Sequence, residues 1–128
     1  MATNVMVRRF TQPNNAWNII LWMLQAIGAA VFIPAGVQKL AGDAGAVQLF
    51  ETIGWGQWLR YVVGLIEIVG GALLLFPNFA AIGSLLMGVM MATALLLHIF
   101  IIGGSPLASV LLLVAMAVVA YGRREQYM

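Results

Sequence analysis

Apolar residues form four long stretches in the sequence, and short polar segments separate them. These stretches cover about residues 17–37, 59–76, 79–102 and 106–121. A helix that crosses the hydrocarbon core of a bilayer needs about 20 predominantly apolar residues. The pattern therefore predicts four membrane-spanning helices. Pro34 lies near the end of the first stretch and predicts a bend there.

The segment between the first and second stretches has the pattern of a short amphipathic helix. Apolar residues recur at helical spacing over Gly45–Ile53, and polar residues occupy the opposite side. Asp43 can cap the start of this helix, and Gly54 can end it. A helix of this kind lies in the membrane surface. Trp55 and Trp58 follow at the depth where interfacial aromatic residues gather.

The composition of the chain supports the same architecture. Of its 128 residues, 63% are hydrophobic and 8% are charged, a balance far from that of soluble globular domains. No Asp, Glu, Lys or Arg occurs from Ile68 to Gly122. We therefore expect an all-α integral membrane four-helix bundle that forms one domain over residues 1–128. The short interfacial helix lies in the loop between its first and second spans.

The positions of the basic residues predict the orientation in the membrane. Arg8 and Arg9 precede the first span, and Arg123 and Arg124 follow the fourth. Because Lys and Arg are enriched in cytoplasmic segments, we expect a multi-pass protein of the inner (cytoplasmic) membrane with both termini in the cytoplasm. The amphipathic helix then lies at the outer face. The net charge is only +2 and no basic face is clustered, which excludes nucleic-acid binding.

The chain contains no cysteine, and this excludes several redox chemistries for the chain alone. Electron transfer between dithiols and quinones needs thiols, and iron–sulfur clusters and thiolate zinc sites need cysteine ligands. Glu67 is the only strong companion that His98 has as a metal ligand, whereas metal sites normally use three or four ligands. We therefore expect no metal, and no cofactor held by the chain itself except a quinone or lipid.

Glu67 is the most informative residue because it lies near the middle of the second apolar stretch. A carboxylate at that depth costs at least about 2.5 to 3.5 kcal/mol unless it faces protein, water or a partner. Gly64 and Gly71 share its helical face and allow another helix to come close. We therefore expect Glu67 to point into the bundle, and the second and third spans to pack closely.

Other small or polar residues are candidates for contacts between helices. The third span carries small residues at four-residue spacing, which form a stripe suited to close packing. Gln25 is the polar residue in the interior of the first span, and its amide is expected to hydrogen-bond to another helix. The helix-packing candidates are Gly36, Gly64, Gly70, Gly71, Ser84, Gly88 and Ala92.

Several sequence elements occur in an order that resembles the DoxX-like family of small membrane proteins. They are AGVQKL at the end of the first span, VGLIEIVGGALLL in the second, MGVMMATALLLH in the third and a Pro at the start of the fourth. The resemblance covers about Gly28–Arg124 and implies a four-helix bundle. Where many relatives have Gly-Pro, this chain has Gly54-Trp55. The family elements correspond by position to Gly36, Lys39, Glu67, Gly70, Gly71 and His98.

The resemblance implies a link to membrane redox systems. The family is named for a small subunit linked to a terminal quinol oxidase and to thiosulfate:quinone oxidoreductase in an archaeon, and most members have no established activity. The implied function is a small subunit or accessory protein of a quinone-linked redox system. The implied partners are the lipid bilayer and either subunits of a membrane redox complex or further copies of the chain. A family does not by itself define a reaction, so whether the chain is an enzyme stays open.

Three interpretations of the ionisable residues Glu67, His98 and Lys39 are open. The three groups could hold the helices in register without any chemistry. They could instead line a pocket for a quinone or another lipid-like molecule, as ligand-binding or proton-relay residues. In the third interpretation the chain is a non-catalytic interaction subunit whose surface matters more than its interior. We also expect Glu67 and His98 to titrate as one unit if they lie within hydrogen-bond reach, directly or through one water. No catalytic residue is assigned.

Overall fold

The computed structural model describes residues 15–126, and this part of the chain consists of helices and turns, with no strand. The prediction based on Arg8 and Arg9 falls outside the described residues. In chain order the helices are α2 (Asn15–Ala41), α3 (Ala44–Ile53), α4 (Trp58–Leu73), α5 (Ala80–Leu97), the π-helix η1 (His98–Ile102), α6 (Leu107–Gly122) and the 3-10 helix η2 (Arg124–Gln126). The predicted all-α class is confirmed for the described residues.

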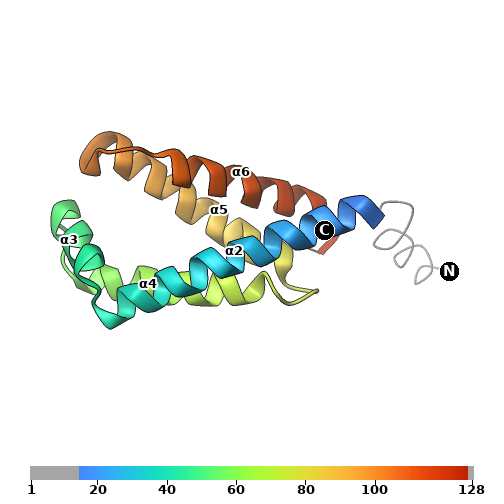
Figure 1. Cartoon of the computed structure of the whole chain (residues 1–128), viewed down its shortest axis with the longest axis horizontal. Coiled ribbons are helices and arrows are strands. Elements are labelled where there is room, and N and C mark those ends of the chain that lie inside the picture. Colours follow the sequence, from blue (N-terminus) through green and yellow to red (C-terminus); the bar gives the residue numbers. More distant parts are fainter. Residues whose placement is uncertain (1–14, 127–128) are drawn as a thin grey trace.

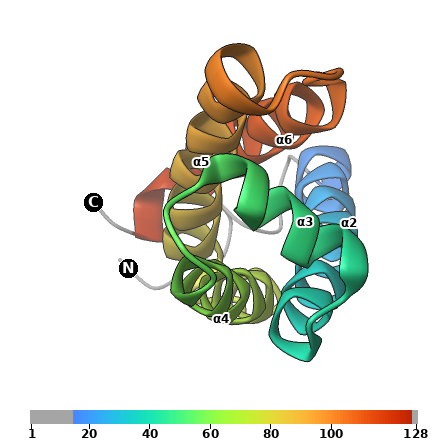
Figure 2. The same cartoon turned by 90° about the vertical axis from the view of Figure 1, so that its left-hand side faces the viewer.

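The four long helices form two pairs. α2 packs mainly on α4, and α5 packs mainly on α6. The pairs meet where α4 contacts α5 and where α2 contacts α6, so that the four helices lie together as Figure 1 shows. The end of α6 lies near the start of α2, and α3 lies at the opposite end of the molecule. When the molecule is seen from that end, α3 lies across the ends of the long helices (Figure 2).

Two of the helices have the length and hydropathy of membrane spans. They are Ala16–Ala41, which is nearly all of α2, and Ala80–Ile102, which joins α5 and η1. Only 11% of the most apolar part of the second helix is buried, and the rest of its side chains are half-buried or exposed. An apolar helix surface of this size indicates contact with lipid or with another protein.

α4 and α6 are shorter than a typical membrane span. Each has 16 residues, a length of about 24 Å, whereas the hydrocarbon core is about 30 Å thick. α4 ends at Leu73 and not at Phe76, because the backbone N–H groups of Leu75 and Phe76 hydrogen-bond only three residues back, to Ala72 and Leu73. The predicted end of the second span is therefore wound into a tighter turn.

α2 continues through Pro34 and ends at Ala41, about one turn beyond the predicted end at Val37. Arg60 of α4 explains the extra turn, since its Nη1 donates a hydrogen bond to the carbonyl oxygen of Lys39. The last carbonyl groups of a helix have no partner within the helix, and the arginine supplies one of these partners. The extension places the side chain of Lys39 beside α4.

α3 is capped at both ends as the sequence predicts. The side chain of Asp43 accepts a hydrogen bond of 3.2 Å from the backbone N–H of Gly45. Gly54 ends the helix with a φ angle of 84°, a left-handed conformation that favours glycine. Phe50 and Ile53 are buried, so the apolar side of α3 faces the bundle.

Glu67 points inward as predicted, but its glycine-bearing face packs against α2 and not against the third span. Glu67 is only 5% exposed. A Cβ atom added at Gly64 would lie 2.9 Å from the carbonyl oxygen of Gly36, and one added at Gly71 would lie 2.8 Å from the side chain of Ile33. The prediction of the partner helix was wrong because α2 carries a glycine of its own that fits this face.

α4 and α5 come close at a different place, near Gly70 and Gly83. A Cβ atom added at Gly83 would lie 3.1 Å from the carbonyl oxygen of Gly70. The predicted small-residue stripe of α5 faces α6, the helix on which α5 mainly packs, and lines a hollow of about 260 Å³ there. The stripe residues in this hollow are Ser84, Gly88 and Ala92.

Gln25 makes the predicted hydrogen bond between helices. Its Nε2 donates to the carbonyl oxygen of Leu74 at 2.8 Å, and its Oε1 accepts from Nε of Arg123 at 2.9 Å. Arg123 also donates from Nη1 to Asn18 Oδ1 at 2.8 Å. One buried amide therefore joins α2 to the end of α4 and to the residue that follows α6. The main buried apolar cluster consists of Phe32, Leu74, Met87, Met91 and Met116.

Candidate functional site

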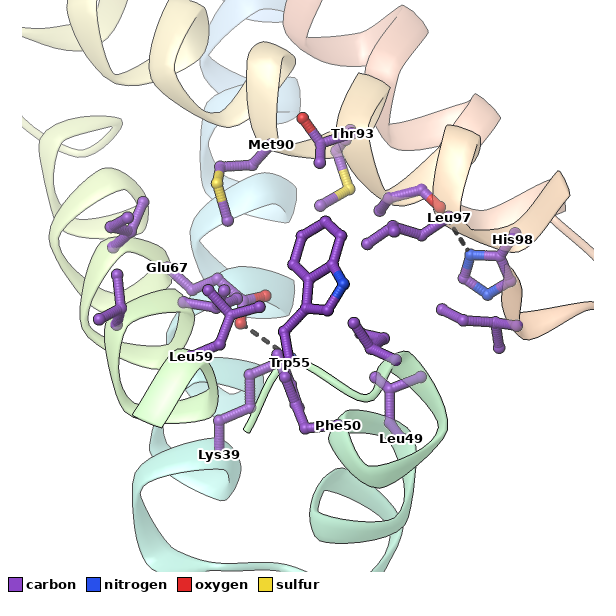
Figure 3. Close-up of a pocket in the computed structure, with 17 residues that line it drawn as sticks. Lys39, Leu49, Phe50, Trp55, Leu59, Glu67, Met90, Thr93, Leu97 and His98 are labelled. Atoms are coloured by element: carbon purple, nitrogen blue, oxygen red, sulfur yellow. Dashed lines mark hydrogen bonds and ion pairs between the residues drawn. The ribbon is translucent and has the colours of Figure 1, made fainter. Parts of the chain in front are cut away.

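A pocket of about 370 Å³ lies between α3, α4 and the α5–η1 helix, as the close-up in Figure 3 shows. It forms because α3 lies across the end of the bundle and covers the space between the two helix pairs. The polar side chains that line it belong to Lys39, Glu67, Thr93 and His98. The other lining residues are Leu49, Phe50, Ile53, Trp55, Leu59, Val62, Val63, Ile66, Met90, Met91, Ala94, Leu97 and Ile102.

Lys39 and Glu67 form an ion pair on the α2–α4 side of the pocket. Lys39 Nζ lies 2.8 Å from Glu67 Oε1, and the two side chains are 17% and 6% exposed. Lys39 lies three positions after Gly36, and Glu67 lies three positions after Gly64. The backbones of α2 and α4 approach closely at these two glycines, and this brings the two charged side chains together. The burial of each charge is tolerated because the other compensates it.

His98 lies where α5 ends and η1 begins, on the side of the pocket away from Glu67 (Figure 3). Its Nδ1 lies 2.9 Å from the carbonyl oxygen of Ala94. A carbonyl oxygen can only accept a hydrogen bond, so Nδ1 is the donor. When an imidazole is neutral and Nδ1 carries its proton, Nε2 is an acceptor. Within residues 15–126 no group hydrogen-bonds to Nε2. This nitrogen is therefore available to a ligand.

The structure brings Glu67 together with Lys39 but not with His98. No hydrogen bond or ion pair between Glu67 and His98 occurs in the described part of the chain, and each group has a partner of its own. In the view of Figure 3 the indole of Trp55 stands between them. A direct hydrogen bond between the two groups is thus not formed, and their joint titration through one water stays a prediction. They are two separate polar groups at the edges of one apolar pocket.

Two buried arginines have structural roles that the sequence analysis missed. Arg60 is 6% exposed, and besides the α2 carbonyl it binds Gln57, with Nε donating to Oε1 at 2.8 Å. Arg60 lies one turn before Gly64 on the buried face of α4, and this spacing could have indicated from the sequence that its side chain is buried. Arg123 is 5% exposed. Burial lowers the pKa of the Arg123 guanidinium from its usual value, and the charge of Glu125 opposes this shift.

The arrangement is suited to binding and offers little for metal chemistry. Within residues 15–126 there is no group of three or more His, Cys, Asp or Glu side chains that could hold a metal ion. The pocket instead combines broad apolar walls with a carboxylate–ammonium pair on one side and an imidazole acceptor on the other. Pockets for small molecules typically have this mixture of apolar surface and a few fixed polar groups.

Comparison with known proteins places these residues in a family. A family model described as DoxX matches residues 20–103, which include all three predicted ionisable site residues. The protein "Putative oxidoreductase CatD" of Bacillus subtilis (strain 168) is 30% identical over 83 residues, which are 65% of this chain and 59% of that protein. The match therefore spans less than two thirds of the relative. No solved structure matches the chain. Since the DoxX model covers more than half of its residues, this membrane protein belongs to the DoxX family.

Proposed function

We propose that the protein is a small subunit or accessory protein of a quinone-linked membrane redox system, and that its pocket holds a quinone or quinol. One observation carries the proposal: an apolar pocket at the end of the bundle contains a buried Lys39–Glu67 ion pair and an unpartnered Nε2 of His98. The name of the Bacillus subtilis relative, "Putative oxidoreductase CatD", supports a redox role.

The pocket residues fit this type of molecule in size and in chemistry. A volume of about 370 Å³ lies within the range of about 300 to 1,000 Å³ that small-molecule sites occupy. Lys39 can donate a hydrogen bond to a carbonyl oxygen of a quinone. Nε2 of His98 can accept one from a hydroxyl group of a quinol. The apolar walls match the ring and the start of an isoprenoid tail.

In this proposal the groups that transfer electrons belong to another subunit of the complex. The chain has no cysteine and so supplies neither a dithiol nor a thiolate ligand of its own. A quinone held beside this bundle would be exchanged with another subunit of a membrane complex, or with a further copy of the chain. The outward-facing apolar surface of α5 is compatible with such a partner as well as with lipid.

The proposal includes an arrangement in the membrane. The inner membrane is crossed by α2, α4, α5 with η1, and α6. Four crossings leave both termini on the same side, and the basic residues favour the cytoplasm as that side. α3 lies at the outer surface, and the pocket is then in the outer half of the bilayer. α4 and α6 reach across because the bilayer thins locally or their flanking turns enter the interface, at a modest cost per ångström of mismatch.

The test is ligand binding by the purified chain in lipid nanodiscs, with a short-chain benzoquinol as the probe. Saturable binding is expected for the wild type in equilibrium dialysis. His98→Phe keeps an aromatic ring but removes the acceptor, and we expect about 2- to 10-fold weaker binding, as for the loss of one hydrogen bond. Phe100→Leu is the control, because Phe100 lies in the same helix, is 76% exposed and does not line the pocket. Equal binding by His98→Phe would contradict the assignment of His98.

A second candidate function is a non-catalytic structural or interaction subunit. The observation in its favour is that the Lys39–Glu67 ion pair joins α2 to α4 directly, which would give the buried charges a structural role without a ligand. The two functions predict different results in the same experiment. If the wild type shows no saturable binding of the benzoquinol, the structural function is the correct one.

A further inference from the structure

We propose that Trp55 is the ring-recognition residue of the pocket, and that a planar ring of the ligand stacks on its indole. This inference rests on the proposed function and narrows it: the ligand is defined by an aromatic or quinonoid ring, and a lipid with only acyl chains does not satisfy the site. Aromatic side chains favour planar partners because offset stacking adds a contribution beyond the burial of apolar area.

The first argument is the position of the indole. Trp55 follows α3, and Figure 3 shows its ring standing inside the pocket, with Met90 and Thr93 beyond one end and Phe50 below. The residue nevertheless keeps 61% of its surface exposed. A large planar side chain that lines a pocket without being packed there leaves ring surface free for a ligand.

The second argument is the backbone that holds Trp55. It lies between Gly54, with φ of 84°, and Gly56, with φ of 101°. Both angles are in the left-handed region that residues with a side chain rarely adopt. The carbonyl oxygen of Trp55 accepts a hydrogen bond of 2.8 Å from Nε1 of Trp58. The two glycines and this hydrogen bond define the turn that directs the indole back over the pocket.

The third argument is the contrast with Trp58, which is equally exposed at 62%. Trp58 does not line the pocket. Its Nε1 is engaged by the Trp55 carbonyl, and its exposure at the start of α4 is what an interfacial anchoring tryptophan shows. Trp55 differs because its indole faces the pocket. The two residues therefore form a natural pair of test and control.

The experiment measures the dissociation constant of a short-chain benzoquinol in nanodiscs for four proteins: wild type, Trp55→Leu, Trp55→Phe and Trp58→Leu. Trp55→Leu keeps an apolar side chain but removes the ring, and we expect binding to weaken about tenfold, the effect of losing a stacking contact. Trp55→Phe retains a ring, so its affinity should stay within about threefold of the wild type. Trp58→Leu should bind like the wild type. Thermal unfolding of each variant establishes that it is folded.

Two outcomes overturn the inference, and they are distinguishable. If the wild type and Trp55→Leu bind the benzoquinol equally well, Trp55 does not recognise the ring, whereas the proposed function stands. If the wild type binds no benzoquinol, the proposed function and the inference both fail. Competition with decanoate gives a further check, because displacement of the benzoquinol by this ringless acid at equal concentration would also contradict selection for a ring.

Discussion

At the scale of single residues, the two members of the buried ion pair are not equivalent. Glu67 lies in the interior of α4 with a side chain that is 6% exposed, whereas Lys39 lies in the last turn of α2 and is 17% exposed. A long lysine side chain near a helix end can reach the interface when it loses its partner. A carboxylate in the middle of an apolar helix has no such route.

This difference predicts unequal effects of removing either charge. Lys39→Met leaves the Glu67 carboxylate buried and unpaired, and we expect it to lower the free energy of unfolding by about 3 to 5 kcal/mol. Glu67→Gln leaves an ammonium group that can move toward water, so its cost should be clearly smaller. The free energies of unfolding are measured in detergent micelles by denaturation with sodium dodecyl sulfate.

The double variant supplies the internal control for this prediction. Lys39→Met combined with Glu67→Gln leaves no unpaired charge, and it should recover most of the stability lost by Lys39→Met alone. Glu51→Gln, in the exposed part of α3, should have almost no effect. Equal losses in the two single variants would show that the exposure of Lys39 does not matter.

Sequence reasoning succeeded for residues whose chemistry is exceptional in their surroundings. Glu67 and Gln25 are polar groups in apolar helices, and each points inward, as the cost of exposing it to lipid demands. Arg123 was interpreted only as a marker of orientation, and Arg60 was given no role of its own. Their acceptors include groups 21 and 98 residues away in the chain, and no local pattern identifies contacts at such separations.

At the scale of helices, the contact between α2 and α4 depends on two glycines. The backbone of Gly64 lies against that of Gly36, so that a Cβ atom at position 64 would be 2.9 Å from a carbonyl oxygen and 3.0 Å from Cβ of Lys39. Neither neighbour is the flexible end of a side chain. The helices therefore have to separate if position 64 gains a methyl group.

Gly64→Ala is accordingly expected to destabilise the protein by about 1 to 3 kcal/mol, the usual cost of overpacking. Gly88→Ala is the matched control in α5, because its added Cβ would meet only Met116, at an ordinary distance of 3.7 Å. Alanine also has the higher helix propensity, by up to about 1 kcal/mol, so this control should be neutral or stabilising. Both changes are measured as shifts of the unfolding free energy in detergent. A stable Gly64→Ala protein would mean that α2 and α4 pack less tightly than described.

The same contact shows what helix patterns predict and what they leave undetermined. Local features fixed the ends of α3, where Asp43 and Gly54 act through hydrogen bonds within a few residues. Small residues at regular spacing identify a face that allows close approach, but several faces in this chain have that pattern. Which helix packs on α4 depends on how all four helices fit together. The partner therefore cannot be predicted from the sequence of α4 alone.

At the scale of the whole molecule, the pocket is a consequence of how the helix pairs meet. α4 and α5 approach closely near Gly70 and Gly83, and α3 is inserted at the other end, where it contacts η1 as well as α4. A wedge-shaped space results, closed at one end by glycine packing and covered at the other by the apolar side of α3. The four apolar stretches and three polar residues that line the pocket could be recognised from the sequence, but the role of α3 in covering this space could not.

The arrangement predicts where different parts of the chain can be labelled from outside the membrane. The sequence has no cysteine, so each single cysteine introduced is the only reporter in its protein. With four crossings and both termini in the cytoplasm, as proposed above, Ala2→Cys and Gln126→Cys should react with an impermeant maleimide only after the membrane is opened. Glu51→Cys in α3 should react in intact bacterial spheroplasts, because the proposed arrangement has α3 at the outer surface. If the two terminal positions were labelled from opposite sides, the number of crossings would be odd, and α4 or α6, the two short helices, would have to lie along the membrane instead of spanning it.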